Sequence, residues 1–250
     1  MKTIQGTVAL VTGASRGIGA EVATILAGRG ADVAINYRSK GPRAAEVAAA
    51  VEGQGRRALL VQADLTEGAD LAGLASGIAS AFGRLDIVIL NASGGLEKDR
   101  PGDYAMRLNR DAQVATLDHV FPLLADGGTV VFVTSHWAHF YGRQAVYPGY
   151  ERVAESKRAG EEALRARIPE LADRGIRLIV VSGDVIEGTI TPRLLERGQP
   201  GLLNARRSLA GTLPTIATFA TAIVDSITDP GLSSGDVVFV GPTEEFPPAG

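Results

Sequence analysis

Seven short runs rich in valine, isoleucine and leucine recur along this chain of 250 residues. They occupy residues 7–12, 31–37, 57–63, 85–92, 127–135, 175–183 and 236–240. Nearly continuous apolar runs of this length are typical of strands that are buried on both faces, as in a parallel sheet. Because longer stretches of helical period separate most of the runs, the sequence predicts an α/β fold in three layers: a doubly wound parallel sheet of about seven strands with helices on both faces.

The longer stretches predict the helices that cover this sheet. They lie at 17–30, 41–55, 66–83, 101–124, 149–168 and 214–228, whereas residues 184–214 are interrupted by proline and glycine. No repeat, low-complexity segment or linker divides the chain, so we expect a single domain over residues 1–250. Residues 241–250 carry little apolar content, and we expect a loosely held end there.

The composition excludes several classes of function. The formal net charge is −3, which argues against a nucleic-acid partner, and the absence of cysteine excludes disulfides and thiolate metal sites. We expect no metal. No apolar run approaches the ~18 residues of a membrane span, and the N-terminus lacks the pattern of a signal peptide. We therefore expect no membrane association and a cytoplasmic protein.

A glycine-rich turn, "TGASRGIG" at residues 12–19, follows the first apolar run and opens the first helical stretch. Gly13, Gly17 and Gly19 permit a tight turn, a close approach of the backbone to a pyrophosphate, and close packing of the helix on the strand. The helix N-terminus offers free N–H groups and the positive end of its dipole to phosphates. This context predicts a dinucleotide-binding site.

Three further motifs accompany that turn. They are "LNASGG" at 90–95, "VFVTS" at 131–135 and "ESKRAG" at 155–160. With the TGxxxGxG spacing, they resemble the single-domain branch of the short-chain dehydrogenase/reductase family over about residues 4–241. The resemblance implies a Rossmann-type domain, a small-molecule carbonyl or alcohol substrate, a substrate lid at 184–214, and a homotetramer or homodimer formed through the helices at 101–124 and 149–168.

The resemblance also implies a set of residues around the cofactor, with Asp64 against the adenine ring and Asn91 and Gly94 along the adenosine side. Either Thr189 or Thr191 corresponds to the threonine that contacts the cofactor amide and phosphate. The expected cofactor-binding residues are Gly13, Ser15, Arg16, Gly17, Ile18, Gly19, Tyr37, Arg38, Ser39, Asp64, Leu65, Asn91, Ala92, Ser93, Lys157, Gly183 and Thr189.

The residues after the second predicted strand favour NADP(H) over NAD(H). Enzymes that use NAD place a carboxylate there, which repels a 2′-phosphate. Here the position reads Tyr37, followed by Arg38, Ser39 and Lys40, and Arg16 lies in the glycine-rich turn. Arginine and lysine favour a dianionic phosphate through charge-assisted hydrogen bonds. The alternative is that Arg38 and Lys40 are only solvated loop charges.

The catalytic pattern of the family is incomplete in this sequence. The resemblance assigns Ser135 to the catalytic serine, Lys157 to the lysine that holds the nicotinamide ribose, and Asn109 to the asparagine that holds a water beside that lysine. The family's proton-donating tyrosine precedes the lysine by four residues, and Val153 occupies that position. Valine has no proton to give, so the usual route is closed.

Several nearby residues are candidates for the missing acid. Tyr147 lies twelve residues after Ser135, close to the family's usual separation, which indicates an insertion before the helix. Tyr150 lies seven residues before Lys157, although helical side chains lean toward the N-terminus and carry its ring away from the lysine. His136, which titrates near neutral pH, is a third candidate, and His139 and Tyr141 share its loop. Each of them could equally serve only packing.

We therefore predict an NADP(H)-dependent oxidoreductase that reduces a ketone or oxidises an alcohol, with the role of Val153 moved to another residue or a water. The alternative is a catalytically inactive NADP(H)-binding protein, either a sensor or a partner subunit. Reduction of a carbon–carbon double bond is a third possibility. The arginines of the lid segment, Arg193, Arg197, Arg206 and Arg207, would suit an acidic or phosphate-bearing substrate, or form a solvated face.

Overall fold

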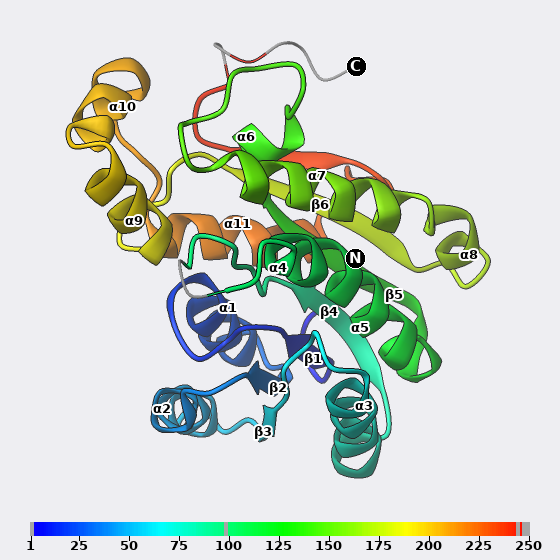
Figure 1. The fold of residues 1–250 in the computed structure, drawn as a ribbon. Helices are drawn as coiled ribbons and strands as arrows, with labels where there is room; N and C mark the ends of the chain where they lie inside the picture. Colours follow the sequence, from blue (N-terminus) through cyan, green and yellow to red (C-terminus); the bar gives the residue numbers. More distant parts are fainter. Residues whose placement is uncertain (1–2, 98–99, 244–245, 247–250) are drawn as a thin grey trace.

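The computed structural model describes residues 3–97, 100–243 and 246, and its strands form one parallel sheet (Figure 1). The order across the sheet is β3-β2-β1-β4-β5-β6-β7, and every neighbouring pair is parallel. The predicted fold class is confirmed. The strands are β1 (Val8–Val11), β2 (Asp32–Tyr37), β3 (Ala58–Gln62), β4 (Leu85–Leu90), β5 (Leu124–Ser135), β6 (Arg177–Gly183) and β7 (Val237–Val240).

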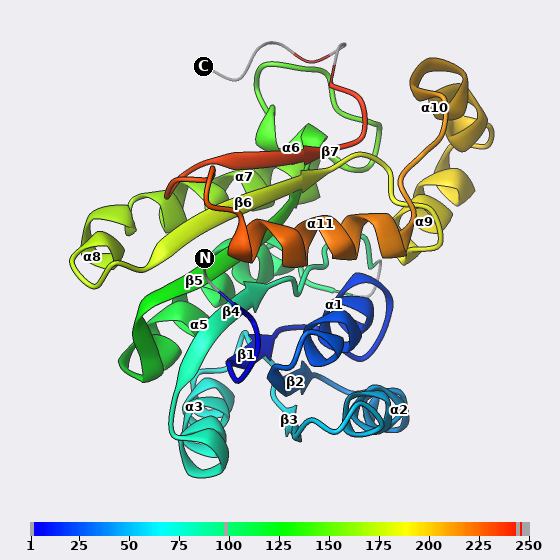
Figure 2. The same cartoon turned by 180° about the vertical axis from the view of Figure 1, so that it is seen from behind.

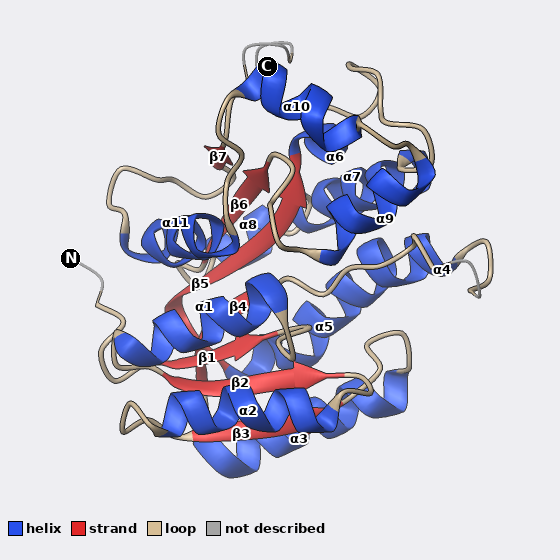
Figure 3. Cartoon of the chain, turned by 90° about the vertical axis from the view of Figure 1, so that its left-hand side faces the viewer, coloured by secondary structure: helices blue, strands red, loops and turns tan. Residues whose placement is uncertain are grey.

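Helices cover both faces of the sheet (Figure 2, Figure 3). α1 (Gly17–Gly28), α2 (Gly41–Glu52) and α11 (Ile216–Thr228) pack on one face, and α3 (Gly68–Phe82), α5 (Ala112–Val120) and α7 (Glu151–Arg165) pack on the other. The remaining helices are α4 (Tyr104–Met106), α6 (His136–His139), α8 (Ile168–Ala172), α9 (Ile190–Gly198) and α10 (Leu202–Ala210).

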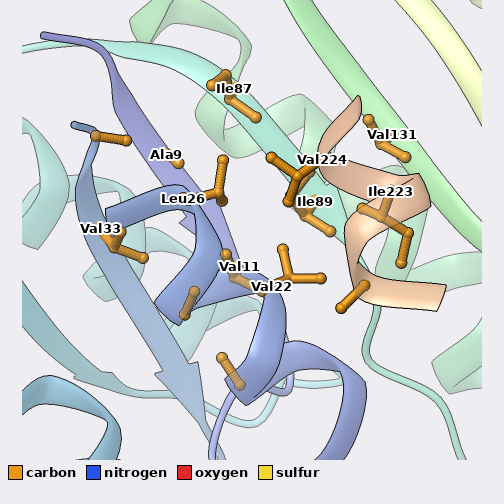
Figure 4. Close-up of a cluster of buried hydrophobic side chains, with 14 of the residues drawn as sticks. Ala9, Val11, Val22, Leu26, Val33, Ile87, Ile89, Val131, Ile223 and Val224 are labelled. Carbon is orange, nitrogen blue, oxygen red and sulfur yellow. The ribbon is translucent and has the colours of Figure 1, made fainter. Parts of the chain in front are cut away.

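The central strands are mostly apolar because each contributes to two cores. In β1, Ala9 and Val11 face the cluster beneath α1 and α11, whereas Val8 and Leu10 face the cluster beneath α3 and α5. Successive side chains of a strand point to opposite faces, so a strand covered on both sides has no polar face. Figure 4 shows the first of these clusters. Its labelled members are Ala9, Val11, Val22, Leu26, Val33, Ile87, Ile89, Val131, Ile223 and Val224.

Three segments are more finely divided than the sequence pattern indicates. Residues 101–124 contain α4, a π-helix at Arg107–Asp111, α5 and a 3-10 turn at Phe121–Leu123. The stretch 149–168 is α7 followed by the start of α8, whose first turn contains Pro169. Residues 184–214 hold two helices, α9 and α10, despite their proline and glycine content.

No described helix is long and apolar enough to cross a membrane. Within residues 3–97, 100–243 and 246, no group of three or more histidine, aspartate or glutamate residues could hold a metal ion. Of the loosely held end that we expect at 241–250, residues 244–245 and 247–250 lie outside the described residues. Phe246 is buried and packs on Trp137 and Phe140, so the expectation is wrong for that residue.

Candidate active site

The candidate site lies at the carboxyl ends of the strands, where the chain winds outward in two directions from β1 and β4. The glycine-rich turn follows β1, and Asn91 follows β4. Ser135 ends β5 and is paired in register with Gly183, which ends β6. The expected cofactor and catalytic residues therefore converge on one edge of the sheet.

The conformation of the glycine-rich turn is compatible with the pyrophosphate site that we expect there. Gly13 and Gly17 have φ values of +64° and +57°, which favour glycine. A Cβ on Gly13 would lie 3.0 Å from Ala92 Cα, and one on Gly19 would lie 2.6 Å from Asn91 Nδ2. α1 then begins with no side-chain cap and no acidic residue in its first turn. Its N–H groups and dipole fit an anionic group, with Ser15 and Ile18 in the same turn.

Two buried polar side chains, Thr12 and Asn36, hold this turn. Neither was predicted from the sequence as a site residue. Thr12 Oγ1 accepts hydrogen bonds from the backbone N–H groups of Asn91 (2.8 Å) and Ala92 (3.0 Å). Asn36 Oδ1 accepts from Gly13 N–H at 3.2 Å, and its amide donates to the Ala63 carbonyl at 3.2 Å. The signal for Asn36 was a polar residue inside the otherwise apolar run of β2.

The residues after β2 present positive charge at the cofactor side. Arg16, Ser39 and Lys40 are exposed, Tyr37 is half-buried, and residues 37–40 contain no carboxylate. The Arg38 guanidinium donates to the hydroxyl of Tyr104, a buried residue of α4. These charges fit a phosphate.

The adenosine side is bordered by the ends of β3 and β4. Asp64 Oδ1 accepts hydrogen bonds from the backbone and hydroxyl of Thr66 at 3.1 and 2.8 Å, which fixes the carboxylate after β3. Leu65 is buried, and Ser93 is exposed in the loop after β4. The roles expected for Asp64 and Leu65 at the adenine ring therefore stay predictions.

Tyr150 is the residue that the structure brings to Ser135. The Tyr150 hydroxyl lies 3.1 Å from Ser135 Oγ, and the tyrosine is 5% exposed. Burial raises the pKa of Tyr150, and the hydrogen bond with Ser135 opposes that rise. Tyr150 is the N-cap of α7 and not an interior helical residue. The lean of helical side chains, which we expected to carry its ring away from Lys157, therefore does not determine where the ring lies.

Lys157 lies beneath the same strand end. Its Nζ donates to the Val133 carbonyl at 3.3 Å, and the residue is 8% exposed. Burial lowers the pKa of Lys157 from 10.5 to about 8, because the charged form loses hydration. An ammonium has three donors, so it can bind ribose hydroxyls in addition to this carbonyl.

Asn109 occupies the π-helix, which distorts the helix opposite α7. Its Nδ2 donates to the Gly94 carbonyl and to Ser156 Oγ, both at 2.9 Å, and its Oδ1 accepts from Gly94 N–H. A Cβ on Gly160 would lie 2.1 Å from the Asn109 carbonyl, so α7 approaches this turn closely. Asn109 thus links the loop after β4 to the residue beside Lys157, at a type of distortion that is frequent in functional sites.

The other candidates for the acid lie elsewhere. His136 Nδ1 is bonded to Ser182 Oγ at 2.9 Å, and its ring packs edge-on to Phe239. Burial lowers the pKa of His136 to about 4, so the ring is neutral at pH 7. The Tyr147 ring packs on Trp137, with centroids 4.6 Å apart, and burial raises the pKa of its phenol. The structure therefore pairs neither His136 nor Tyr147 with Ser135.

His139, the remaining histidine of that loop, also lies apart from Ser135. Its Nδ1 lies 3.0 Å from Glu161 Oε1 on α7. The pKa of the Glu161 carboxyl stays below its usual range despite burial, because hydrogen bonds from His139 and Arg165 favour its charged form. This network joins α6 to α7 behind the candidate site.

Val153 is buried one turn after Tyr150 and packs on the loop that follows β4. A Cβ on Gly95 would lie 3.2 Å from Val153 Cγ2.

Farther along the chain, Thr189 is the N-cap of α9, and its hydroxyl donates to the Ile186 carbonyl at 2.9 Å. This geometry leaves the choice between Thr189 and Thr191 open.

The chain resembles known reductases in sequence. A 180-residue alignment with a hydroxynaphthalene reductase from Aspergillus fumigatus is 37% identical and covers 69% of this chain but only 63% of the relative's length. A hydroxynaphthalene reductase-like protein from Metarhizium brunneum is 33% identical over 80% of this chain and 78% of that protein. The 1-cyclohexenylcarbonyl-CoA reductase of Streptomyces collinus is 32% identical over 72% of this chain and 65% of that protein.

Solved structures and a family model agree with these relatives. A short chain dehydrogenase from Burkholderia cenocepacia in complex with NADP has a TM-score of 0.83 at 29% identity, with 96% of this chain and 98% of that chain covered. An angucycline C-6 ketoreductase with bound NADP has a TM-score of 0.81 at 28% identity, with 95% of each chain covered. The family model described as short chain dehydrogenase matches residues 7–197. The chain belongs to the short-chain dehydrogenase/reductase family of oxidoreductases.

Proposed function

We propose that this protein is an NADP(H)-dependent carbonyl reductase in which Tyr150 takes the role of the proton donor that Val153 cannot fill. The observation that carries the proposal is the 3.1 Å contact between the Tyr150 hydroxyl and Ser135 Oγ at the end of β5. A buried phenol paired with the serine of the family pattern is the arrangement that a general acid requires.

Each residue has a distinct part in the reduction. NADPH, when bound, supplies the hydride to the substrate carbon. Ser135 holds the carbonyl oxygen by a hydrogen bond, and Tyr150 donates its proton to that oxygen. Burial raises the pKa of Tyr150, so the phenol carries its proton at neutral pH, and the hydrogen bond with Ser135 opposes that rise. The Lys157 ammonium, with a pKa of about 8, is mostly charged at pH 7 and can bind the ribose.

The preference for NADP(H) follows from the charges after β2. Arg16, Arg38 and Lys40 are cations without a neighbouring carboxylate in residues 37–40. Two of the similar solved structures contain NADP. A 2′-phosphate would draw Arg38 from its contact with Tyr104, exchanging a neutral acceptor for a charged one.

The substrate side is apolar and aromatic. A substrate-side cluster is formed by buried residues from α6, α7 and the expected lid: Trp137, Tyr150, Val153, Leu195 and Leu202. The Tyr147 ring packs against it. An aromatic ketone suits such a wall, and two of the relatives are named for hydroxynaphthalene. We further propose that α9 and α10 close over this substrate and that the active form is a homodimer or homotetramer.

Reduction of a carbon–carbon double bond conjugated to a carbonyl is a second candidate. One relative is named a 1-cyclohexenylcarbonyl-CoA reductase. In a conjugated substrate, the carbon that accepts the hydride is two atoms beyond the carbonyl carbon. The hydroxyl of Tyr150, which lies one helical turn before Val153, could then bind the carbonyl oxygen while the more distant carbon lies next to the cofactor.

The test compares the purified protein with its Tyr150→Phe and Tyr147→Phe variants. NADPH binding is measured by fluorescence, and NADPH oxidation is followed with 1-tetralone as the aryl ketone and crotonyl-CoA as the conjugated thioester. We expect Tyr150→Phe to lower kcat by about 10²–10⁴-fold with an unchanged Kd for NADPH, because it removes only the acid. Tyr147→Phe should retain most of the activity.

The outcomes separate the candidates. Turnover of the ketone supports carbonyl reduction, whereas turnover of crotonyl-CoA alone supports the second candidate. A Tyr150→Phe variant with the full kcat would remove Tyr150 from the mechanism. Binding of NADPH without turnover of either substrate would favour the non-catalytic alternative.

A further inference from the structure

A buried ion pair joins the expected lid to the sheet beside the candidate active site. Asp184 directly follows β6, and Arg206 lies on α10. The Arg206 Nε lies 2.9 Å from Asp184 Oδ1, and its NH2 lies 2.8 Å from Oδ2, so the pairing is bidentate. The two side chains are 1% and 0% exposed.

The surroundings of this pair lead directly to the catalytic residues. Gly183, the neighbour of Asp184, is paired in register with Ser135. The Arg206 guanidinium lies over the Trp137 ring, 5.1 Å from its centroid. Trp137 follows Ser135 by two residues and packs on Tyr147. A displacement of Arg206 would therefore reach the walls of the substrate site.

The rest of the lid is attached by weaker contacts. α9 and α10 project from the end of the molecule at which α6 lies (Figure 1, Figure 3). Leu195 and Leu202 bury their side chains in the substrate-side cluster, which gives apolar contact without a fixed direction. The next residue of α10, Arg207, pairs with Glu187 at 2.8 Å, but these side chains are 48% and 39% exposed. An exposed pair contributes little, whereas loss of one partner from a buried pair leaves an uncompensated charge.

We propose that the Asp184–Arg206 pair positions α10 over the substrate site, so that lid closure and substrate affinity depend on it. The kinetic part of this inference rests on the proposed reductase function. Asp184 and Arg206 are positioning residues, since they act through α10 and Trp137 and have no assigned contact with the reacting atoms.

The experiment uses Asp184→Asn, Arg206→Met and the double variant in the full chain. Hydrogen–deuterium exchange of residues 190–210 reports the opening of the lid without any substrate. Steady-state kinetics with NADPH and 1-tetralone separate KM from kcat. The matched control is Glu187→Gln with Arg207→Met, which removes the exposed pair from the same helix.

Each single variant should accelerate exchange in residues 190–210 and raise KM about tenfold or more, because it leaves one buried charge without its partner. The double variant contains neither charge, so we expect its exchange and KM to recover only in part: no charge is left uncompensated, but the bidentate contact that holds α10 to the end of β6 is absent. The control should leave exchange and KM within about twofold of wild type.

Three results would overturn the inference: unchanged exchange in both single variants, a loss confined to kcat, or full recovery of wild-type exchange and KM in the double variant. If a single variant does not fold, the double variant compared with wild type and control still decides, because wild-type exchange without either charge would show that the lid does not depend on the pair. If the wild type shows no turnover, the proposed function fails, but the exchange measurement still tests the lid.

Discussion

The two sides of the candidate site are built in different ways. On the cofactor side, the side chains of Thr12, Asn36 and Asn91 form hydrogen bonds with backbone groups. These residues and their partners lie at or just after the ends of strands of the sheet. On the substrate side, Ser135 meets a tyrosine fifteen residues away. There the walls come from residues 136–150 and from α9 and α10. Hydrogen bonds between strand ends fix the first side, and packing of the loop at residues 136–150 and of the two lid helices fixes the second.

This difference locates where the chain departs from its family. The glycine-rich turn retains every glycine of the pattern, and its geometry depends on backbone contacts that tolerate little change. The proton donor that we propose, Tyr150, lies on the other side, where a change in the loop between Ser135 and α7 can bring a different hydroxyl to the same serine. We infer that the acid could move because its position depends on a loop, while the cofactor residues lie on strand ends.

The largest effect on stability that we expect concerns the buried charge of Lys157, on α7 beneath the end of β5 that also carries Ser135. The fall of its pKa from 10.5 to about 8 corresponds to about 3 kcal/mol of folding free energy. Between these pH values the unfolded chain retains the proton and the folded chain does not, so this group makes the protein more stable as pH rises from about 8 to 10.5. Below pH 8 the protonated lysine destabilises the fold by the full amount.

Urea unfolding of the nucleotide-free protein and of Lys157→Met, measured across this pH range, tests the assignment. The unfolding free energy of the wild-type protein should increase relative to that of Lys157→Met as pH rises through this range, because methionine does not titrate. Parallel pH profiles would mean that Lys157 is well solvated or paired in the folded protein.

The cofactor side should respond to the loss of Asn36 with an effect of intermediate size. Asn36→Ala leaves Gly13 N–H and the Ala63 carbonyl without their partners in a buried place. We expect the unfolding free energy to fall by about 2 kcal/mol and the Kd for NADPH to rise by about tenfold, because unsatisfied buried groups are costly and the turn loses its support.

Gln62→Ala is the matched control for Asn36→Ala, since Gln62 makes one hydrogen bond to the Arg38 carbonyl from an exposed position. Calorimetric titration with NADPH and thermal unfolding measure the two quantities. If Asn36→Ala lowers stability but leaves the affinity unchanged, the turn does not depend on this side chain.

The same division explains what the sequence could predict. Strands, covering helices and the glycine-rich turn are encoded by local patterns, and their arrangement was predicted. The π-helix around Asn109 leaves no pattern, because one widened turn in a helix preserves its apolar face. The contact between Tyr150 and Ser135 could not be derived either, since it depends on where α7 begins and on how Trp137 and Tyr147 pack in the preceding loop. Asn36 was detectable as a polar residue in a buried strand.

The smallest effect that we expect concerns the choice of cofactor. Arg38→Ser should weaken NADPH binding by about tenfold and leave NADH binding nearly unchanged, because only NADPH offers a 2′-phosphate to the guanidinium. Arg84→Ser, which removes an exposed arginine just before β4 at the opposite ends of the strands, is the control. Fluorescence titrations with both nucleotides measure the ratio. Equal changes for NADPH and NADH would mean that Arg38 acts through its contact with Tyr104, and no change would mean that it is a solvated loop charge. With either of these two results, the cofactor side recognises the 2′-phosphate through Arg16 and Lys40, or it has no preference for NADPH over NADH. The contrast between a fixed cofactor side and an adaptable substrate side would then rest on the glycine-rich turn alone.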